Sequence, residues 1–214
     1  MQALIKKYNY VLFIALFIGM PLLLLSIGNF QARTFLKNSL SLITIVAFTL
    51  ILAQLFLVRS NTFALKVHDF RKVMNFHKIL GYSVVSIFFF HPFFIVLPRY
   101  FEAGADPIES FIKMITTFES HGVILGLIAW VLMLILGISS VFKHVFNFSY
   151  KAWRIFHGLL SLFFIVIALW HSIELGRHIT MSLRLFFISI ATIGIVMLVK
   201  YYLTLRQRKE NLHA

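Results

Sequence analysis

The stretch that decides the fold is residues 77–97, HKILGYSVVSIFFFHPFFIVL. It is predominantly apolar, and its length suits an α-helix that crosses the hydrocarbon core of a bilayer. His77 and His91 lie in it, 14 positions apart. On an α-helix this spacing is a rise of about 21 Å and just under four turns, so both side chains share nearly one face. The stretch predicts a membrane-spanning helix with two imidazoles on one face.

A second apolar stretch repeats this pattern, because His157 and His171 are also 14 positions apart. Two such helices side by side would form two His–His gaps at different depths, and each gap could hold one haem iron between two imidazoles. A histidine inside a membrane is costly without a partner. A single one could be a hydrogen-bonded core residue or part of a proton relay. The doubled spacing favours haem ligation.

Six apolar segments of about 17 to 21 residues are each long enough to span or nearly span a bilayer. They are Tyr10–Ile27, Leu40–Leu57, His77–Leu97, Gly122–Phe142, Ile155–Ile173 and Leu183–Val199. We therefore predict an all-α membrane protein, a six-helix transmembrane bundle that forms a single domain over residues 1–214.

The composition agrees with a multi-pass protein of the cell (inner) membrane. The chain is 60% hydrophobic and only 13% charged, with a mean hydropathy of +0.92. Its net charge of +13 would suggest nucleic acid in a soluble chain. Beside apolar spans the same charge is explained by topology, so no nucleic-acid partner is expected. With no cysteine, neither Cys-ligated clusters nor covalent c-type haem can form, and any haem is expected to be b-type.

The Lys and Arg residues indicate the orientation. If both termini are cytoplasmic, the outer loops hold only a minority of the 20 basic residues, namely Arg33, Lys37, Arg99, Lys113, Arg177 and Arg184. The positive-inside rule then predicts both termini inside. His77 and His157 would lie near the inner surface, and His91 and His171 toward the outer one. Depth thus pairs His77 with His157 and His91 with His171.

Neighbouring residues suit a porphyrin. Gly81 follows His77 by four positions, where a missing side chain leaves room for a flat macrocycle, and Ser161 has the equivalent place after His157. Arg154, three positions before His157, is the preferred cation for a haem propionate. Several aromatic residues are candidates to line the space between two haems, namely Phe88, Phe89, Phe90, Phe163, Phe164 and Trp170.

The motifs H-K-I-L-G-Y from His77, H-P-F-F from His91, and Y-x-x-W-R-x-x-H from Tyr150 to His157 resemble the ferric reductase-like transmembrane domain. That domain is the haem-bearing part of ferric reductases and NADPH oxidases, and it is similar to the haem subunit of the periplasmic methionine sulfoxide reductase system. The resemblance covers roughly residues 69–178. It implies the same pairing, with two haems b held by four histidines.

The resemblance also implies a function in transmembrane electron transfer. Ferric reductases and NADPH oxidases continue into a flavin- and nicotinamide-binding domain, but the 214 residues contain no Gly-rich dinucleotide motif. We therefore expect an oxidoreductase component that receives electrons from a cytoplasmic flavin reductase or a quinol. It would pass them to ferric iron, oxygen or an extracytoplasmic partner protein.

Other functions remain open at this stage. A quinol-oxidising di-haem cytochrome b, anchoring a dehydrogenase or reductase, also uses paired histidines. A transporter with a histidine proton relay is disfavoured because the spans lack acidic partners. An outer metal or substrate site made of Glu119, His121 and His178 is a further possibility.

Overall fold

The computed structural model describes residues 2–30, 33–58, 61–118, 120–143 and 149–213. The chain is 86% helical, and no strand occurs in these ranges. Six helical segments in them are long and apolar enough to cross a membrane. The predicted all-α, six-helix transmembrane bundle is confirmed. The side of the membrane on which the termini lie, and the single-domain assignment, stay predictions.

The observed helices extend beyond most of the predicted apolar segments. The first span combines α1 (Gln2–Ile14), a π-helical turn η1 (Ala15–Gly19) and α2 (Met20–Ser26). The other spans are α3 (Phe35–Ala53) with the 3₁₀ turn η2 (Gln54–Phe56), α5 (Phe70–Ala103), α7 (His121–Val141), α8 (Tyr150–Leu175) and α9 (Met181–His213). Two short helices, α4 (Thr62–Val67) and α6 (Pro107–Thr116), were not predicted.

Local capping fixes the ends of the two histidine-bearing helices. The Asp69 carboxylate accepts hydrogen bonds from the backbone N–H groups of Arg71 and Lys72 at the start of α5. α5 ends at Ala103 and is capped by Gly104, whose φ of 64° lies in the left-handed region that favours glycine. At the start of α8, the Ser149 hydroxyl accepts from the Ala152 N–H.

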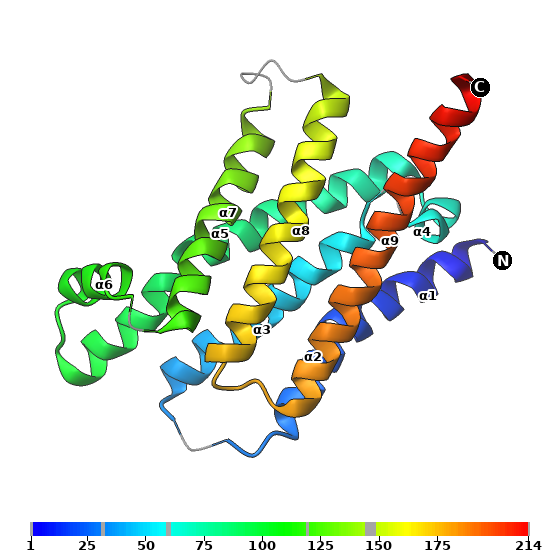
Figure 1. Cartoon of the computed structure of the whole chain (residues 1–214). Coiled ribbons are helices and arrows are strands. Elements are labelled where there is room, and N and C mark those ends of the chain that lie inside the picture. Colours follow the sequence, from blue (N-terminus) through cyan, green and yellow to red (C-terminus); the bar gives the residue numbers. More distant parts are fainter. Residues whose placement is uncertain (1, 31–32, 59–60, 119, 144–148, 214) are drawn as a thin grey trace.

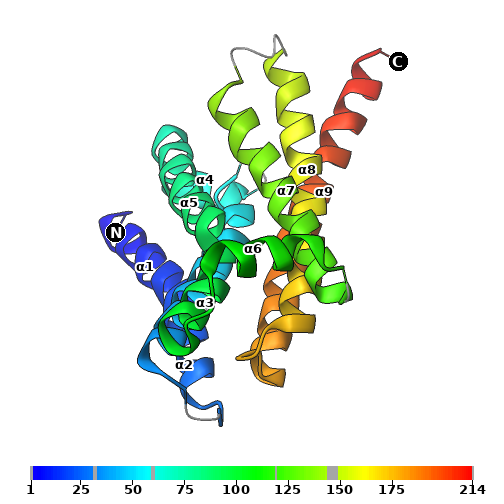
Figure 2. The ribbon, with the colours of Figure 1, turned by 90° about the vertical axis from the view of Figure 1, so that its left-hand side faces the viewer.

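The spans form two layers. In Figure 2, α1, α3 and α5 lie in one layer, and α7, α8 and α9 lie in the other. The closest packing is between α7 and α8, followed by α3 with α5, and the layers meet where α3 contacts α9 and α5 contacts α7. Figure 1 shows α7 and α8 running side by side. The layering places the first pair of histidines in one layer and the second pair in the other.

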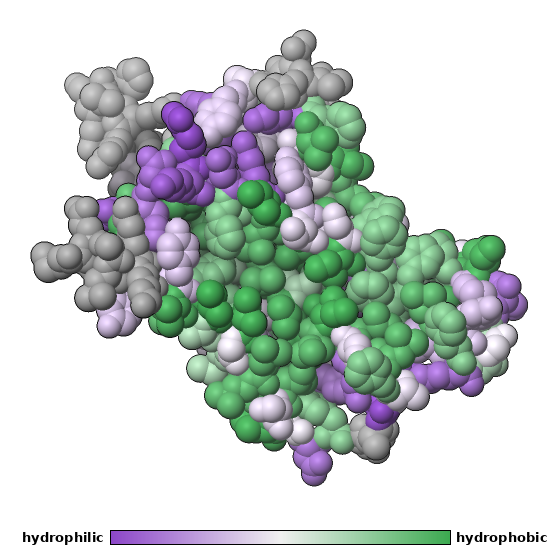
Figure 3. Space-filling model, turned by 180° about the vertical axis from the view of Figure 1, so that it is seen from behind, coloured by the Kyte–Doolittle hydropathy of each residue, from purple (hydrophilic) through white to green (hydrophobic). Residues whose placement is uncertain are grey.

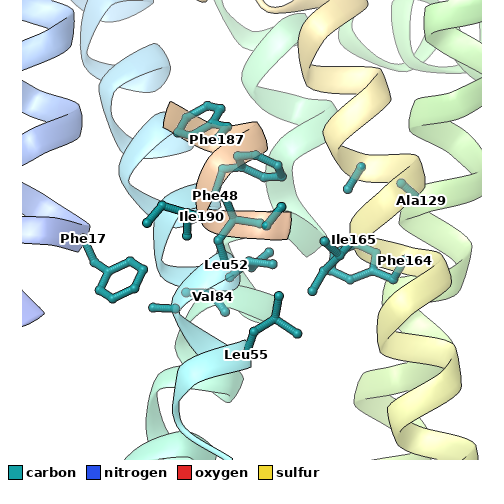
Figure 4. Close-up of a cluster of buried hydrophobic side chains, with 14 of the residues drawn as sticks. Phe17, Phe48, Leu52, Leu55, Val84, Ala129, Phe164, Ile165, Phe187 and Ile190 are labelled. Atoms are coloured by element: carbon teal, nitrogen blue, oxygen red, sulfur yellow. The ribbon is translucent and has the colours of Figure 1, made fainter. Parts of the chain in front are cut away.

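An apolar core joins the layers at their centre. Phe48 of α3 packs edge-on against Phe187 of α9, with ring centroids 5.0 Å apart. Leu52 and Val84 are almost fully buried beside them, and Phe164 and Ile165 of α8 approach from the other layer (Figure 4). Because lipid tails are as apolar as these side chains, close packing rather than exclusion from water holds the helices together.

The outer surface matches a membrane environment. Figure 3 shows apolar side chains over the middle of the molecule, with hydrophilic residues gathered toward two opposite ends. Many large apolar side chains are exposed to the surroundings of the molecule, such as Ile79, Phe163 and Val196. In water such a surface would aggregate. In a bilayer it faces lipid.

Candidate functional site

The four predicted histidines all lie on α5 and α8. His77 and His91 belong to α5, His157 and His171 belong to α8, and each is partly buried. α8 packs closely on α7 and α9, whereas the described parts of α5 and α8 scarcely approach each other along their backbones. The separation between these two helices is therefore bridged by side chains.

His91 and His171 face each other. Their ring centroids lie 6.5 Å apart, with the ring planes nearly perpendicular at 83°. Two imidazoles that bind one metal ion from opposite sides, at a metal–nitrogen distance of about 2 Å, have ring centres roughly 6 Å apart. The observed separation fits one ion shared between the two rings.

The backbone of α7 orients the His171 ring. Its Nδ1 lies 2.7 Å from the Gly122 carbonyl oxygen. Because a carbonyl can only accept, Nδ1 donates and carries the proton, which leaves Nε2 with a free lone pair. Gly126 makes room for this ring, since a Cβ at that position would lie 2.6 Å from the His171 Cε1. A glycine on α7 thus permits the close approach of an imidazole from α8.

His91 lacks such an anchor. Its Nδ1 is buried and has no hydrogen-bond partner among the described residues. The ring lies between Phe88 and Phe94, at centroid distances of 5.6 and 6.2 Å. A buried ring nitrogen without a partner is costly unless another group satisfies it. This site is suited to a bound group that the chain itself does not supply.

The pair predicted to lie near the inner surface, His77 and His157, has more polar neighbours. The His157 ring stacks on Trp153 at 5.1 Å, and its Nδ1 is 3.4 Å from the Ser140 hydroxyl. The Trp153 indole N–H donates to the Ser139 carbonyl, 3.2 Å away, which fixes the stacking partner.

His77 has a neighbour that the sequence analysis missed. The Gln54 side-chain amide of η2 lies 2.6 Å from the His77 Nδ1, 3.2 Å from the His77 carbonyl oxygen and 3.1 Å from the Gly81 nitrogen. A lone amide at the end of an apolar span was the available signal, since polar residues in membranes are usually functional. Their spacing in sequence gave no sign that Gln54 and His77 meet.

Gly81 and Ser161, predicted to lie beside a macrocycle, have near neighbours within the protein. A Cβ on Gly81 would find only the Gln54 amide within 4 Å, at ordinary contact distance. The Ser161 hydroxyl donates to the His157 carbonyl at 2.6 Å, within its own helix. Their contact with a porphyrin stays a prediction.

Arg154 lies one turn before His157 and is partly buried. Its backbone carbonyl accepts a hydrogen bond from the Tyr202 hydroxyl at 3.1 Å. Its Nε is buried with no partner among the described residues. A buried cationic donor without a partner suits a carboxylate, as the propionate prediction requires.

The remaining candidates belong to the predicted aromatic lining and to the predicted outer metal or substrate site. Phe164 belongs to the apolar core, Phe163 and Trp170 are exposed, and the Phe88 ring lies 5.6 Å from the His91 ring. Glu119 lies outside the described residues. His178 instead receives a hydrogen bond from Arg33, with Nη1 to Nε2 at 3.1 Å.

The histidine pairs fit haem better than a bare metal ion. The described ranges contain no group of three or more His, Cys, Asp or Glu residues that could hold an ion. Two imidazoles alone are a poor cage, but a porphyrin supplies the remaining nitrogens and needs only two axial ligands. The unpartnered Arg154 Nε agrees with a bound group that carries carboxylates.

The comparisons with known proteins identify the class. The family model described as "Ferric reductase like transmembrane component" matches residues 43–168, which include His77, His91 and His157. An uncharacterized protein of Archaeoglobus fulgidus is 32% identical over 168 residues, covering 78% of this chain and 91% of that protein. No solved structure matches.

This is a multi-pass integral membrane protein built as a helical electron-transfer domain. The chain belongs to the ferric reductase-like transmembrane family. Domains of this family generally bind haem.

Proposed function

We propose that this protein carries electrons across the membrane through two b-type haems, each held by one histidine of α5 and one of α8. His77 and His157 would hold the inner haem, and His91 and His171 the outer haem. Haem supplies a one-electron couple that neither the backbone nor these side chains possess. The chain contributes binding, orientation and shielding from water.

The facing of His91 and His171 carries this proposal. Their 6.5 Å ring separation suits one shared iron, and the Gly122 carbonyl holds His171 with its Nε2 lone pair free. The 14-position spacing on both helices repeats the arrangement at a second depth. Bis-histidine ligation leaves iron no open position, which favours electron transfer over ligand binding.

The charge distribution supports the direction of transfer. Under the proposed topology, basic residues gather at the cytoplasmic side, where an acidic flavoprotein could dock by electrostatic attraction. We propose a cytoplasmic flavin reductase or a quinol as donor. The acceptor would be extracytoplasmic ferric iron, oxygen or a partner reductase. Arg154, beside His157, would pair with a propionate of the inner haem.

Vesicles offer a direct test. Liposomes that hold the purified protein are loaded with ferricyanide and given dithionite outside, with valinomycin and K⁺ to dissipate the membrane potential. We expect internal ferricyanide to be reduced, because the haems provide a path that the bilayer lacks. His91→Ala and His157→Ala should each lower the rate to that of protein-free vesicles.

Thr49→Val is the matched control. Thr49 is buried on α3, and its hydroxyl donates to the Ile45 carbonyl of the same helix. This variant should keep the wild-type rate. A wild-type rate no higher than that of empty vesicles, or an unchanged rate in His91→Ala, would contradict transmembrane transfer through these ligands.

A further inference from the structure

The chain contains a residue in a membrane span that reaches one of the candidate ligands from another helix. Gln54 is partly buried at the C-terminal end of the α3 span. An amide in this setting is costly unless it finds partners. Its partners are the His77 imidazole and the adjoining backbone of α5.

Resting on the function proposed above, we propose that Gln54 is a positioning residue that orients the His77 imidazole as an axial haem ligand. A metal-bound histidine nearly always bonds its other ring nitrogen to a neighbouring group, which fixes both ring orientation and basicity. Gln54 occupies this place at His77 Nδ1, at 2.6 Å. His171 has the corresponding contact with the Gly122 carbonyl, at 2.7 Å.

The Gln54 amide can form a hydrogen bond with the His77 ring in two orientations. With its nitrogen toward the ring, it donates to the His77 Nδ1 and carbonyl, and its oxygen accepts from the Gly81 N–H. In that case the ring proton is on Nε2. Ligation through Nε2 requires the proton on Nδ1, so the amide must turn its oxygen toward Nδ1–H. The two orientations occupy the same volume, but in the second the amide oxygen faces the His77 carbonyl oxygen and the amide nitrogen faces the Gly81 N–H, so the bond from Nδ1–H replaces the two backbone bonds.

A second reading is that Gln54 only ties η2 to the α5 backbone. In that case the amide keeps its nitrogen toward His77 and bonds the His77 carbonyl and the Gly81 N–H. Either arrangement contributes hydrogen bonds to the fold, so stability alone cannot separate them. The strength of the acceptor at Nδ1 separates them, because it changes how much electron density the imidazole gives to the iron.

Two substitutions change this acceptor in opposite directions. Gln54→Leu has a similar size and no acceptor, so it should move the midpoint potential of the inner haem to a more positive value. Gln54→Glu places a carboxylate at Nδ1, which should move the same potential to a more negative value. Potentiometric titration with optical detection measures both, and low-temperature EPR reports whether the iron stays bis-imidazole and low-spin.

The inner haem is identified as the component that His157→Ala removes. Thr49→Val, again the control on α3, should leave both midpoints unchanged. The wild-type outer haem serves as an internal reference in every titration.

Opposite shifts confined to the inner haem are the expected result. Shifts of the same sign, no shift, or loss of this haem from both variants would overturn the inference, because a residue that only orients the ring leaves both iron ligands in place. A wild-type protein without haem would instead overturn the proposed function, so the two failures are distinguishable.

Discussion

At the residue scale, the site depends on small groups that admit the imidazoles. Gly126 is the clearest case, because its missing side chain leaves the space that the His171 ring occupies. The ring is then held by the Gly122 carbonyl one turn earlier on α7. Two glycines of α7 thus determine the orientation of the candidate ligand His171.

Gly126→Ala should therefore displace His171 and remove the outer haem. The added Cβ would lie within 2.6 Å of the ring, and overpacking of this kind typically costs about 1–3 kcal/mol. We expect the haem content per chain, measured by the pyridine haemochrome assay, to fall to about half of the wild-type value if one of two haems is lost.

Gly137→Ala, on the same helix, is the control. Its Cβ would lie 3.2 Å from the Val85 Cγ1, a contact that a small shift relieves. Full haem content in Gly126→Ala would show that the His171 position in this structure is not the one that binds haem.

At the residue scale, part of the candidate site could be predicted from the sequence. The spacing of His77, His91, His157 and His171 was sufficient to select them, because helix geometry converts spacing into a shared face. Gln54, Ser140 and Gly126 were missed, because each meets its histidine from another helix. Packing between helices is not encoded in local spacing.

At the element scale, the turns beyond the spans were the least predictable part. Six long apolar runs predicted six spans, since length and hydropathy alone are sufficient for a membrane helix. α4 and α6 are short and have no such signal. A hydrogen bond from Arg33 to His178 joins two of these connecting segments, the one after α2 and the turn after α8.

This contact predicts a pH dependence of stability. Burial, together with the charges of Arg33 and Arg177, lowers the pKa of His178 below its ordinary value. The neutral ring accepts the Arg33 hydrogen bond, so its contribution is present above the unfolded pKa of about 6.5 and is lost as the pH falls below it. Thermal melts in detergent at about pH 7.5 and 5.5 should differ more for wild type than for His178→Gln.

His121→Gln, an exposed histidine at the start of α7, is the control and should keep the wild-type difference. An equal pH effect in wild type and in His178→Gln would mean that this contact does not stabilise the fold.

At the scale of the whole molecule, two layers of helices hold the four candidate ligands, two in each layer. α3 and α5 support His77 and His91 from one side, while α7 and α8 support His157 and His171 from the other. The fold class and the family were predictable from the sequence, because apolar runs and the histidine motifs are local signals. The expected depths of the histidines in the membrane were the basis for predicting that α5 lies opposite α8. The contact between the His91 and His171 rings agrees with this prediction.

The most direct test of the central claim is the haem content of the wild type and of the four single His→Ala variants. We expect about two b-type haems per chain with low-spin bis-imidazole spectra. His77→Ala and His157→Ala should remove the same haem, as judged by its spectrum and midpoint potential, and His91→Ala and His171→Ala should remove the other. A colourless protein from haem-replete cells, a single haem per chain, or loss of the same haem in His77→Ala and His91→Ala would contradict the account.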